Sequence, residues 1–339
     1  MSKHKARSTF SRKTVLSLLS EMQKRKEYAS AVDCVPQGMN FRDEIRKAIT
    51  EIQDIRKKPL ICYMANVVSS KIKSSTGIDS MDDLPFSEMV DNIDTNIKDI
   101  DIVLVTPGGS AEQVAKFVNK LRPRFDYVTF ILPNISMSAG TIFALSGDEI
   151  FMDSRAYIGP IDPQVPNRDG RFVPAQSLLT VLSEIQERGQ ELLKNGQNPL
   201  WTDVQILNNI DAKEIGNAIN ASRFSIEMVT EYLSKYKFRT WVTHKNGTSV
   251  TPDQKLQRAT EIASQLCDHA IWKTHSRGIT REIALSTCRL KISHPEDVAG
   301  LNDGIRRFWA LVYWIFESLN IRKIFISDNY SIFRTDVAA

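Results

Sequence analysis

The chain has 339 residues, of which 42% are hydrophobic and 25% are charged, with 15 Gly and 13 Pro. This ordinary globular composition excludes a collagen-like, low-complexity or wholly disordered protein. Lys and Arg number 44 against 40 Asp and Glu, so the net charge of +4 gives no reason to expect a nucleic acid as partner.

Residues 1–30 hold most of the positive charge, with eight Lys or Arg and only two Glu. The apolar residues between 15 and 22 have helical spacing and predict a short amphipathic helix. We interpret the segment as a solubilising arm that packs on the main body. The alternative is an electrostatic contact with nucleic acid, acidic protein or a membrane surface, but no aromatic or Gly-Arg pattern accompanies the charge.

The middle of the chain alternates between strands and helices. A helical stripe of Ile residues ends at a break at 57–59, and later apolar stripes predict helices around 114–121 and 138–145. This alternation predicts an α/β fold with a mostly parallel sheet flanked by helices. Buried strands are predicted at 60–65, 99–105, 127–132 and 149–152.

After Pro174 the pattern becomes helical. Leu and Ile stripes predict helices within 178–193, 204–233 and 256–266, and a last strand is predicted at 323–327. The longest apolar run, 308–316, has nine residues, whereas about 18 are needed to cross a bilayer. No CxxC pair or signal peptide is present, so we expect a reduced, cytoplasmic protein, with peripheral membrane association open through residues 1–30.

Two turns carry the candidate chemistry. Residues 106–110 (TPGGS) and 134–141 (NISMSAGT) each follow a buried strand and open a helix. Gly108 and Gly109 can adopt backbone angles that turn their N–H groups toward a ligand, so two such turns at neighbouring strand ends would make a pocket for a developing oxyanion. Ser138 would project into this pocket. The alternative is a pair of ordinary turns in which Ser138 is only a helix N-cap.

These turns and the segment that follows them resemble a known family. The stretches DIDIVLVTPGGSAEQVAKFVNKLR and ISMSAGTIFALSGDEIFMDSRAYIGPIDPQV resemble the serine dehydrogenase proteinases. These are relatives of signal peptide peptidase A and, more distantly, of the Clp protease in the Clp/crotonase superfamily. The resemblance implies a Clp/crotonase-like serine protease domain at 55–300, between a basic helical extension (1–54) and a C-terminal appendage (301–339).

The resemblance also implies residue roles. Ser138 would be the nucleophile, and Ser136, which lies before the turn, is its nearby competitor. The N–H groups of Gly108, Gly109 and Ala139 would form the oxyanion hole. Acidic residues nearby are interpreted as structural ones: Asp148, Glu149 and Asp162.

The general base has two candidates. Clp-type enzymes use a histidine after the serine, but this chain has IDPQ in the corresponding region. The signal peptide peptidase branch uses a lysine, which burial must keep neutral. Lys194 is the one lysine between Ser138 and Asn209, and it is either the base or a solvated helix cap. His275 is the other candidate base. A neighbouring subunit could also supply the base.

The sequence therefore predicts a serine peptidase that hydrolyses peptide or protein substrates through a Ser138 acyl-enzyme, assembled as a homo-oligomer by analogy with its superfamily. Two alternatives stay open: a catalytically idle scaffold and an acyl-CoA-binding crotonase-like protein. The chain has no metal-ligand spacing, phosphate-binding loop or dinucleotide fingerprint, so no cofactor is expected.

Overall fold

The computed structural model describes residues 41–166 and 170–336, leaving aside the side chains of residues 41 and 42. The chain divides into two compact units. The first unit combines the residues before 158 with those after 290, and the second unit consists of residues 158–290. The predicted amphipathic helix near the N-terminus lies outside the described residues.

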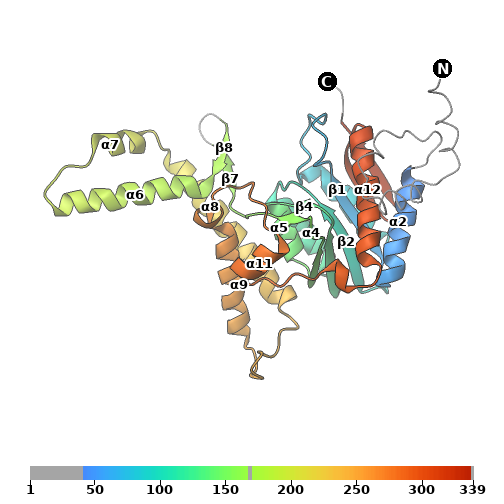
Figure 1. Ribbon diagram of the computed structural model, residues 1–339. Coiled ribbons are helices and arrows are strands. Elements are labelled where there is room, and N and C mark those ends of the chain that lie inside the picture. Colours follow the sequence, from blue (N-terminus) through green and yellow to red (C-terminus); the bar gives the residue numbers. More distant parts are fainter. Residues whose placement is uncertain (1–40, 167–169, 337–339) are drawn as a thin grey trace, which may run out of the picture. The chain divides into compact units, whose positions relative to one another are not determined.

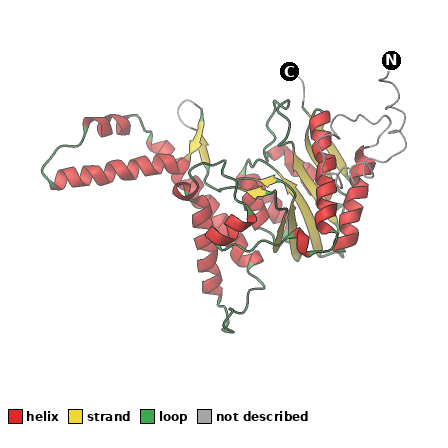
Figure 2. Ribbon diagram, viewed as in Figure 1, coloured by secondary structure: helices red, strands yellow, loops and turns green. Residues whose placement is uncertain are grey.

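The first unit is built on a six-stranded sheet with the order β10-β9-β1-β2-β3-β5 (Figure 1; Figure 2). β1, β2, β3 and β5 are parallel, whereas β9 and β10 are antiparallel to their neighbours. This arrangement confirms the predicted mostly parallel sheet. The strands are β1 (Leu60–Ala65), β2 (Asp99–Val105), β3 (Tyr127–Leu132), β5 (Glu149–Met152), β9 (Ile321–Ile326) and β10 (Ser331–Thr335).

Helices cover both faces of this sheet. On one face, α2 (Phe41–Arg56) and α12 (Leu301–Ser318) pack against β1 and β9. On the other face lie α3 (Asp83–Asp91), α4 (Ala111–Leu121) and α5 (Ala139–Leu145), joined by an aromatic cluster. The buried rings of this cluster are Tyr63, Phe86, Phe117, Phe130 and Phe143. Each buried ring contributes roughly 1.5–3 kcal/mol of hydrophobic stabilisation, so this face anchors the short helix α5.

Short elements complete the first unit. The strand β4 (Ile135–Ser136) precedes α5, and a 3₁₀ turn, η3 (Ser80–Asp82), precedes α3. A second 3₁₀ turn, η5 (Pro295–Asp297), precedes α12, and β6 (Tyr157–Ile158) lies where the two units join in sequence.

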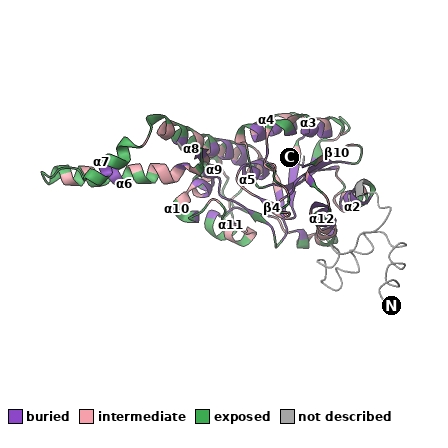
Figure 3. Cartoon of the chain, turned by 90° about the horizontal axis from the view of Figure 1, so that it is seen from above, coloured by how far each residue is buried: buried purple, intermediate pink, exposed green. Residues whose placement is uncertain are grey.

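The second unit is mainly helical. Its small hairpin of β7 (Gln164–Pro166) and β8 (Phe172–Pro174) leads into α6 (Ala175–Lys194) and α7 (Trp201–Asn208). The core of the unit is formed by α8 (Ala212–Tyr232) and α9 (Pro252–Cys267), while α6 and α7 carry mostly exposed or partly exposed residues (Figure 3). The remaining helices are the π-turn η4 (Leu233–Lys237), α10 (His269–Trp272) and α11 (Arg281–Cys288).

The C-terminal part of the chain is more integrated than its sequence suggested. The last predicted strand begins two residues earlier than expected, as β9, and β10 was not predicted at all. Residues 301–336 supply α12, β9 and β10 to the first unit. The division at 54 and 300 stays a prediction, but these boundaries do not coincide with those of the two units.

Within the described ranges, no helix is long and apolar enough to cross a membrane. Cys62, Cys267 and Cys288 are buried free thiols.

Candidate active site

The two candidate turns lie edge to edge where β2 and β3 end. The Thr106 N–H donates to the Ile135 carbonyl at 3.0 Å, and the Met137 N–H donates to the Thr106 carbonyl at 3.0 Å. These bonds pair Thr106 with Ser136 of β4 in the parallel sense, beyond the ends of β2 and β3 and two residues out of their register. The structure therefore brings the Gly108–Gly109 turn and the Ser138 turn together at one edge of the sheet.

Ser138 has an unusual backbone conformation, with φ 52° and ψ −119°. Residues other than glycine rarely adopt such backbone angles. These angles persist only where the surrounding structure imposes them. A serine on a strained strand-to-helix turn is the arrangement known as the nucleophile elbow, which exposes the hydroxyl above the sheet. Ser138 is partly exposed, and its side chain makes no capping bond to α5. The interpretation of Ser138 as a plain N-cap is therefore not supported.

The two turns contact each other at Gly108. It has φ +111°, and a Cβ built on it would lie 2.8 Å from the Ser138 Cβ. Gly140 is equally confined, because a Cβ there would lie 2.3 Å from the Thr106 Cγ2. Both positions need glycine if the two turns are to approach this closely.

The N–H groups of the predicted oxyanion hole differ in their surroundings. The Gly108 N–H donates to the Thr106 hydroxyl at 3.1 Å. In the described part of the chain, the N–H groups of Gly109 and Ala139 have no protein acceptor. Of the three predicted donors, the Gly108 N–H therefore already has an acceptor and the other two do not.

Gly109 is held by a residue that the sequence did not point to. The Ile78 N–H donates to the Gly108 carbonyl at 2.6 Å, and the Ser110 N–H donates to the Ile78 carbonyl at 2.9 Å. A Cβ on Gly109, whose φ is +133°, would lie 2.4 Å from the backbone N and O of Ile78. No local motif marks Ile78, because it acts only through its backbone.

Two other polar residues singled out in the sequence, Ser136 beside the turn and Asp148 beside the start of β3, face the interior. The Ser136 side chain is fully buried, and its hydroxyl has no hydrogen-bond partner among the described residues. Asp148 forms a buried ion pair with Arg122 at 2.7 Å and accepts the Val128 N–H at 2.9 Å. These contacts fit a structural role for Asp148.

The second unit contains both candidate bases. Lys194 is exposed at the last residue of α6. His275 contacts the fully buried carboxylate of Asp162 through Nδ1 at 2.8 Å, and His269 contacts the same carboxylate through Nδ1 at 3.2 Å. The sequence predicted a structural role for Asp162. No local spacing links it to histidines more than 100 residues away.

The buried cysteines have raised pKa values. Burial, together with the Asp162 charge, raises the pKa of the Cys267 thiol to about 12, and burial raises that of Cys288 to about 11. Both thiols therefore stay protonated and are poor nucleophiles at neutral pH. Among the described residues, no group of three or more His, Cys, Asp or Glu side chains is arranged to hold a metal ion.

The first unit is thus a mostly parallel α/β domain with a serine on a strained turn beside a glycine turn. Residues 87–197 match the sequence model of the ClpP-like SDH-type serine proteinases. This match confirms the resemblance predicted from the sequence.

Two relatives come from Methanocaldococcus jannaschii. The uncharacterized protein MJ1495 is 40% identical over 80 residues, which are 24% of this chain and 26% of that protein. The uncharacterized protein MJ0137 is 40% identical over 90 residues, or 26% and 29% of the two chains. The chain thus spans little more than a quarter of the length of the curated relatives it matches.

Among solved structures, a mutant of the 1510-N membrane-bound stomatin-specific protease in complex with a substrate peptide is similar over 53% of this chain and 67% of that chain. The identity is 18% and the TM-score is 0.31.

The close approach of the two turns predicts opposite effects of two glycine substitutions. Gly140→Ala should lower the free energy of unfolding by about 1–3 kcal/mol, because its Cβ would overlap Thr106. Gly216→Ala, inside α8 with no atom within 4 Å of the new Cβ, should raise it by about 0.5–1 kcal/mol. Urea unfolding followed by circular dichroism measures both. Equal effects of the two substitutions would contradict the packing described.

Proposed function

We propose that this chain is a serine peptidase that hydrolyses peptide bonds through an acyl-enzyme on Ser138. The observation that supports this most strongly is the strained backbone of Ser138, in contact with the Gly108 turn. Strain of this kind costs stability, and it is characteristic of positions where a side chain must be presented to a substrate. The family match over residues 87–197 supports the same reaction class.

In this proposal, the Ser138 Oγ attacks the carbonyl carbon of the scissile peptide, and its proton passes to a general base. The carbonyl oxygen becomes an oxyanion that accepts hydrogen bonds from the Gly109 and Ala139 N–H groups, the two donors without a protein acceptor. The base then returns the proton to the leaving amine, and water hydrolyses the ester. Gly108 contributes by leaving space beside Ser138.

A fluorophosphonate probe tests the nucleophile. Labelling of the full chain should disappear in Ser138→Ala, because the probe reacts with an activated serine hydroxyl. The matched control is Ser136→Ala, which removes a buried hydroxyl two residues away and should retain labelling. Mass spectrometry of the labelled peptide identifies the modified residue.

The possible outcomes separate the functions. Labelling that persists in Ser138→Ala would contradict the proposed nucleophile. A wild-type chain that is never labelled, but binds acyl-CoA in a titration, would support a crotonase-like protein instead. A chain with neither property would be an idle scaffold.

His275 is our proposed general base. A carboxylate on Nδ1 orients an imidazole and leaves Nε2 to accept a proton, and Asp162 offers such a carboxylate with none of its side chain exposed. A lysine must be neutral to act as a base, which requires burial, whereas Lys194 is exposed in this chain. Asp162 then becomes the orienting residue of the base.

Single substitutions distinguish the two bases. His275→Gln should lower the kcat for a chromogenic peptide substrate by about 10²-fold or more, because proton transfer from Ser138 is lost. Two controls should change kcat little: His269→Gln, which contacts the same carboxylate, and Lys194→Ala. A large loss in Lys194→Ala with normal activity in His275→Gln would show that lysine is the base.

We also propose that the chain forms a homo-oligomer through α6 and α7. Large hydrophobic side chains are exposed along this segment, whereas surface apolar residues on monomeric proteins are usually scattered singly. Trp201 is 76% exposed and Leu193 is 64% exposed. The others are Val181, Leu200, Val204, Ile206 and Leu207. A second copy of the chain offers a matching apolar surface, and it could also cover Lys194.

Light scattering coupled to gel filtration tests the oligomer. Trp201→Ser should lower the molar mass toward that of one chain, because it removes the most exposed of these apolar side chains. Leu84→Ser changes a side chain that is 66% exposed on α3 of the first unit and should leave the mass unchanged. A wild-type chain that is monomeric at all concentrations would exclude this proposal.

A further inference from the structure

A buried lysine lies in the middle of β9. Lys323 pairs with Ala65 of β1 on one side and with Arg334 of β10 on the other, and none of its side chain is exposed. Lysine is almost never fully buried unless it is paired. A side chain of this kind calls for an explanation beyond the packing of the strand.

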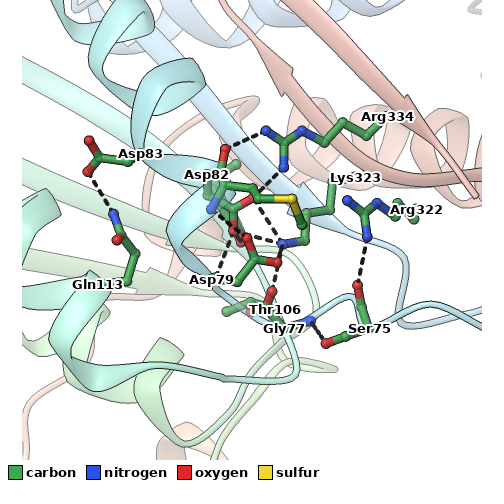
Figure 4. A network of polar contacts seen from close by, with 12 residues as sticks. Ser75, Gly77, Asp79, Asp82, Asp83, Thr106, Gln113, Arg322, Lys323 and Arg334 are labelled. Atoms are coloured by element: carbon green, nitrogen blue, oxygen red, sulfur yellow. Dashed lines mark hydrogen bonds and ion pairs between the residues drawn. The ribbon is translucent and has the colours of Figure 1, made fainter.

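The Lys323 ammonium donates to three residues (Figure 4). Its Nζ lies 2.6 Å from the Gly77 carbonyl, 2.9 Å from an Asp79 carboxylate oxygen and 2.7 Å from an Asp82 carboxylate oxygen. An ammonium has three N–H donors, so all of them are used. Burial opposes the charge of Asp79, but the hydrogen bond and charge of Lys323 outweigh it and hold its pKa below the ordinary value.

The cluster is balanced in charge. Arg334 contacts Asp82 at 3.2 Å through Nη1 and bonds the Met81 carbonyl, so two cations face two carboxylates. Asp82 is fully buried and also accepts from the Tyr63 hydroxyl at 2.7 Å. With its charges compensated, the cluster holds the segment 77–82 in place against β9.

From Lys323, a chain of hydrogen bonds runs to the oxyanion turn. The Gly77 carbonyl and the Ile78 N–H belong to one peptide group, which accepts from Lys323 and donates to the Gly108 carbonyl at 2.6 Å. The Gly108 carbonyl and the Gly109 N–H belong to the next peptide group in this chain. The ammonium is thus joined to the Gly109 N–H through two peptide groups.

This arrangement has two physical consequences. In a trans peptide the C=O and N–H point in opposite directions, so fixing the Gly108 carbonyl on Ile78 fixes the direction of the Gly109 N–H. Hydrogen bonds in series also polarise one another, and a buried cation at the start strengthens the donor at the end. Both effects act on the Gly109 N–H, one of the two predicted donors without a protein acceptor.

We propose that Lys323 is a positioning residue that orients and polarises the Gly109 N–H through the Gly77–Ile78 and Gly108–Gly109 peptide groups. The role rests on the proposed function, in which that N–H stabilises the oxyanion. Lys323 itself does not touch the substrate.

The experiment uses two variants that differ only at Lys323. Lys323→Met alone would leave the buried Asp82 and the partly exposed Asp79 facing one cation and endanger folding. Lys323→Met/Asp82→Asn restores the balance of charge, and Asp82→Asn alone is its matched control, because it keeps the bond from Lys323 to Gly77. Arg322→Met is a second control, since Arg322 contacts Ser75 at 3.5 Å but not the Gly77 carbonyl.

The Gly109 amide can be observed directly. Gly108–Gly109 is the one consecutive glycine pair in the sequence. In full-length protein labelled with ¹³C-carbonyl, ¹⁵N glycine, an HNCO spectrum therefore contains a signal for Gly109 alone. Its amide proton should move upfield in Lys323→Met/Asp82→Asn relative to Asp82→Asn, because the donor is less polarised. It should not move in Arg322→Met.

Kinetics give a second readout. Relative to Asp82→Asn, the double variant should lose about tenfold in kcat per Ser138 titrated with the fluorophosphonate, with KM unchanged. A purely structural role would lower the number of titrated sites but not kcat per site. An unmoved Gly109 amide or an unchanged kcat per site would overturn the proposal. If the wild-type chain is not labelled at Ser138, the proposed function fails and the catalytic role of Lys323 with it, whereas the amide shift still tests the polarisation.

Discussion

The parallel pairing of β2 and β3, continued by the two backbone bonds of Thr106, is the constraint on which the site depends. It places one turn after each strand at a common edge of the sheet. A slip of one residue would move every side chain of a strand to the opposite face of the sheet, and both faces of β2 and β3 are buried against helices. The pairing of Thr106 with Ser136 beyond these strands then aligns Gly108 with Ser138, and neither turn could produce this contact alone.

The strained backbone around Ser138 is maintained by packing beneath it. A residue in such a conformation costs about 1–3 kcal/mol. Every residue of α5 is buried, and Phe143 packs between Phe86 and Phe130 with ring centroids 5.7 and 4.9 Å away. A short helix held this firmly cannot shift to relieve the turn that precedes it. The fold therefore holds the serine in a conformation that its local sequence would not favour.

The parts of the structure that could be predicted carry a local sequence pattern, and the parts that could not be predicted carry none. The bounds of β1, β2, β3 and β5 were predicted to the residue, because each is a buried run bounded by turn or breaker residues. The strand β10, with partly exposed residues and no apolar run, gave no such signal. The pairs Asp162–His275 and Asp82–Lys323 join residues 113 and 241 positions apart, which no local pattern links. The turn at Ser138 was predictable because its signal is a short motif, whereas these long-range pairs carry none.

A buried ion cluster needs a reason other than stability, since apolar side chains of similar volume often stabilise a core as well or better. A methionine or leucine at position 323 could complete β9 and pack against Tyr63 and Phe325. It could not bind the Gly77 carbonyl and two carboxylates at the same time, as an ammonium with three donors does. The segment 66–77 contains no regular helix or strand of its own, so this contact and the bonds to Gly108 and Ser110 together hold Ile78 in position. A residue on a C-terminal strand thereby controls the backbone of a turn more than 200 residues earlier, and only a charged side chain can do so from inside the core.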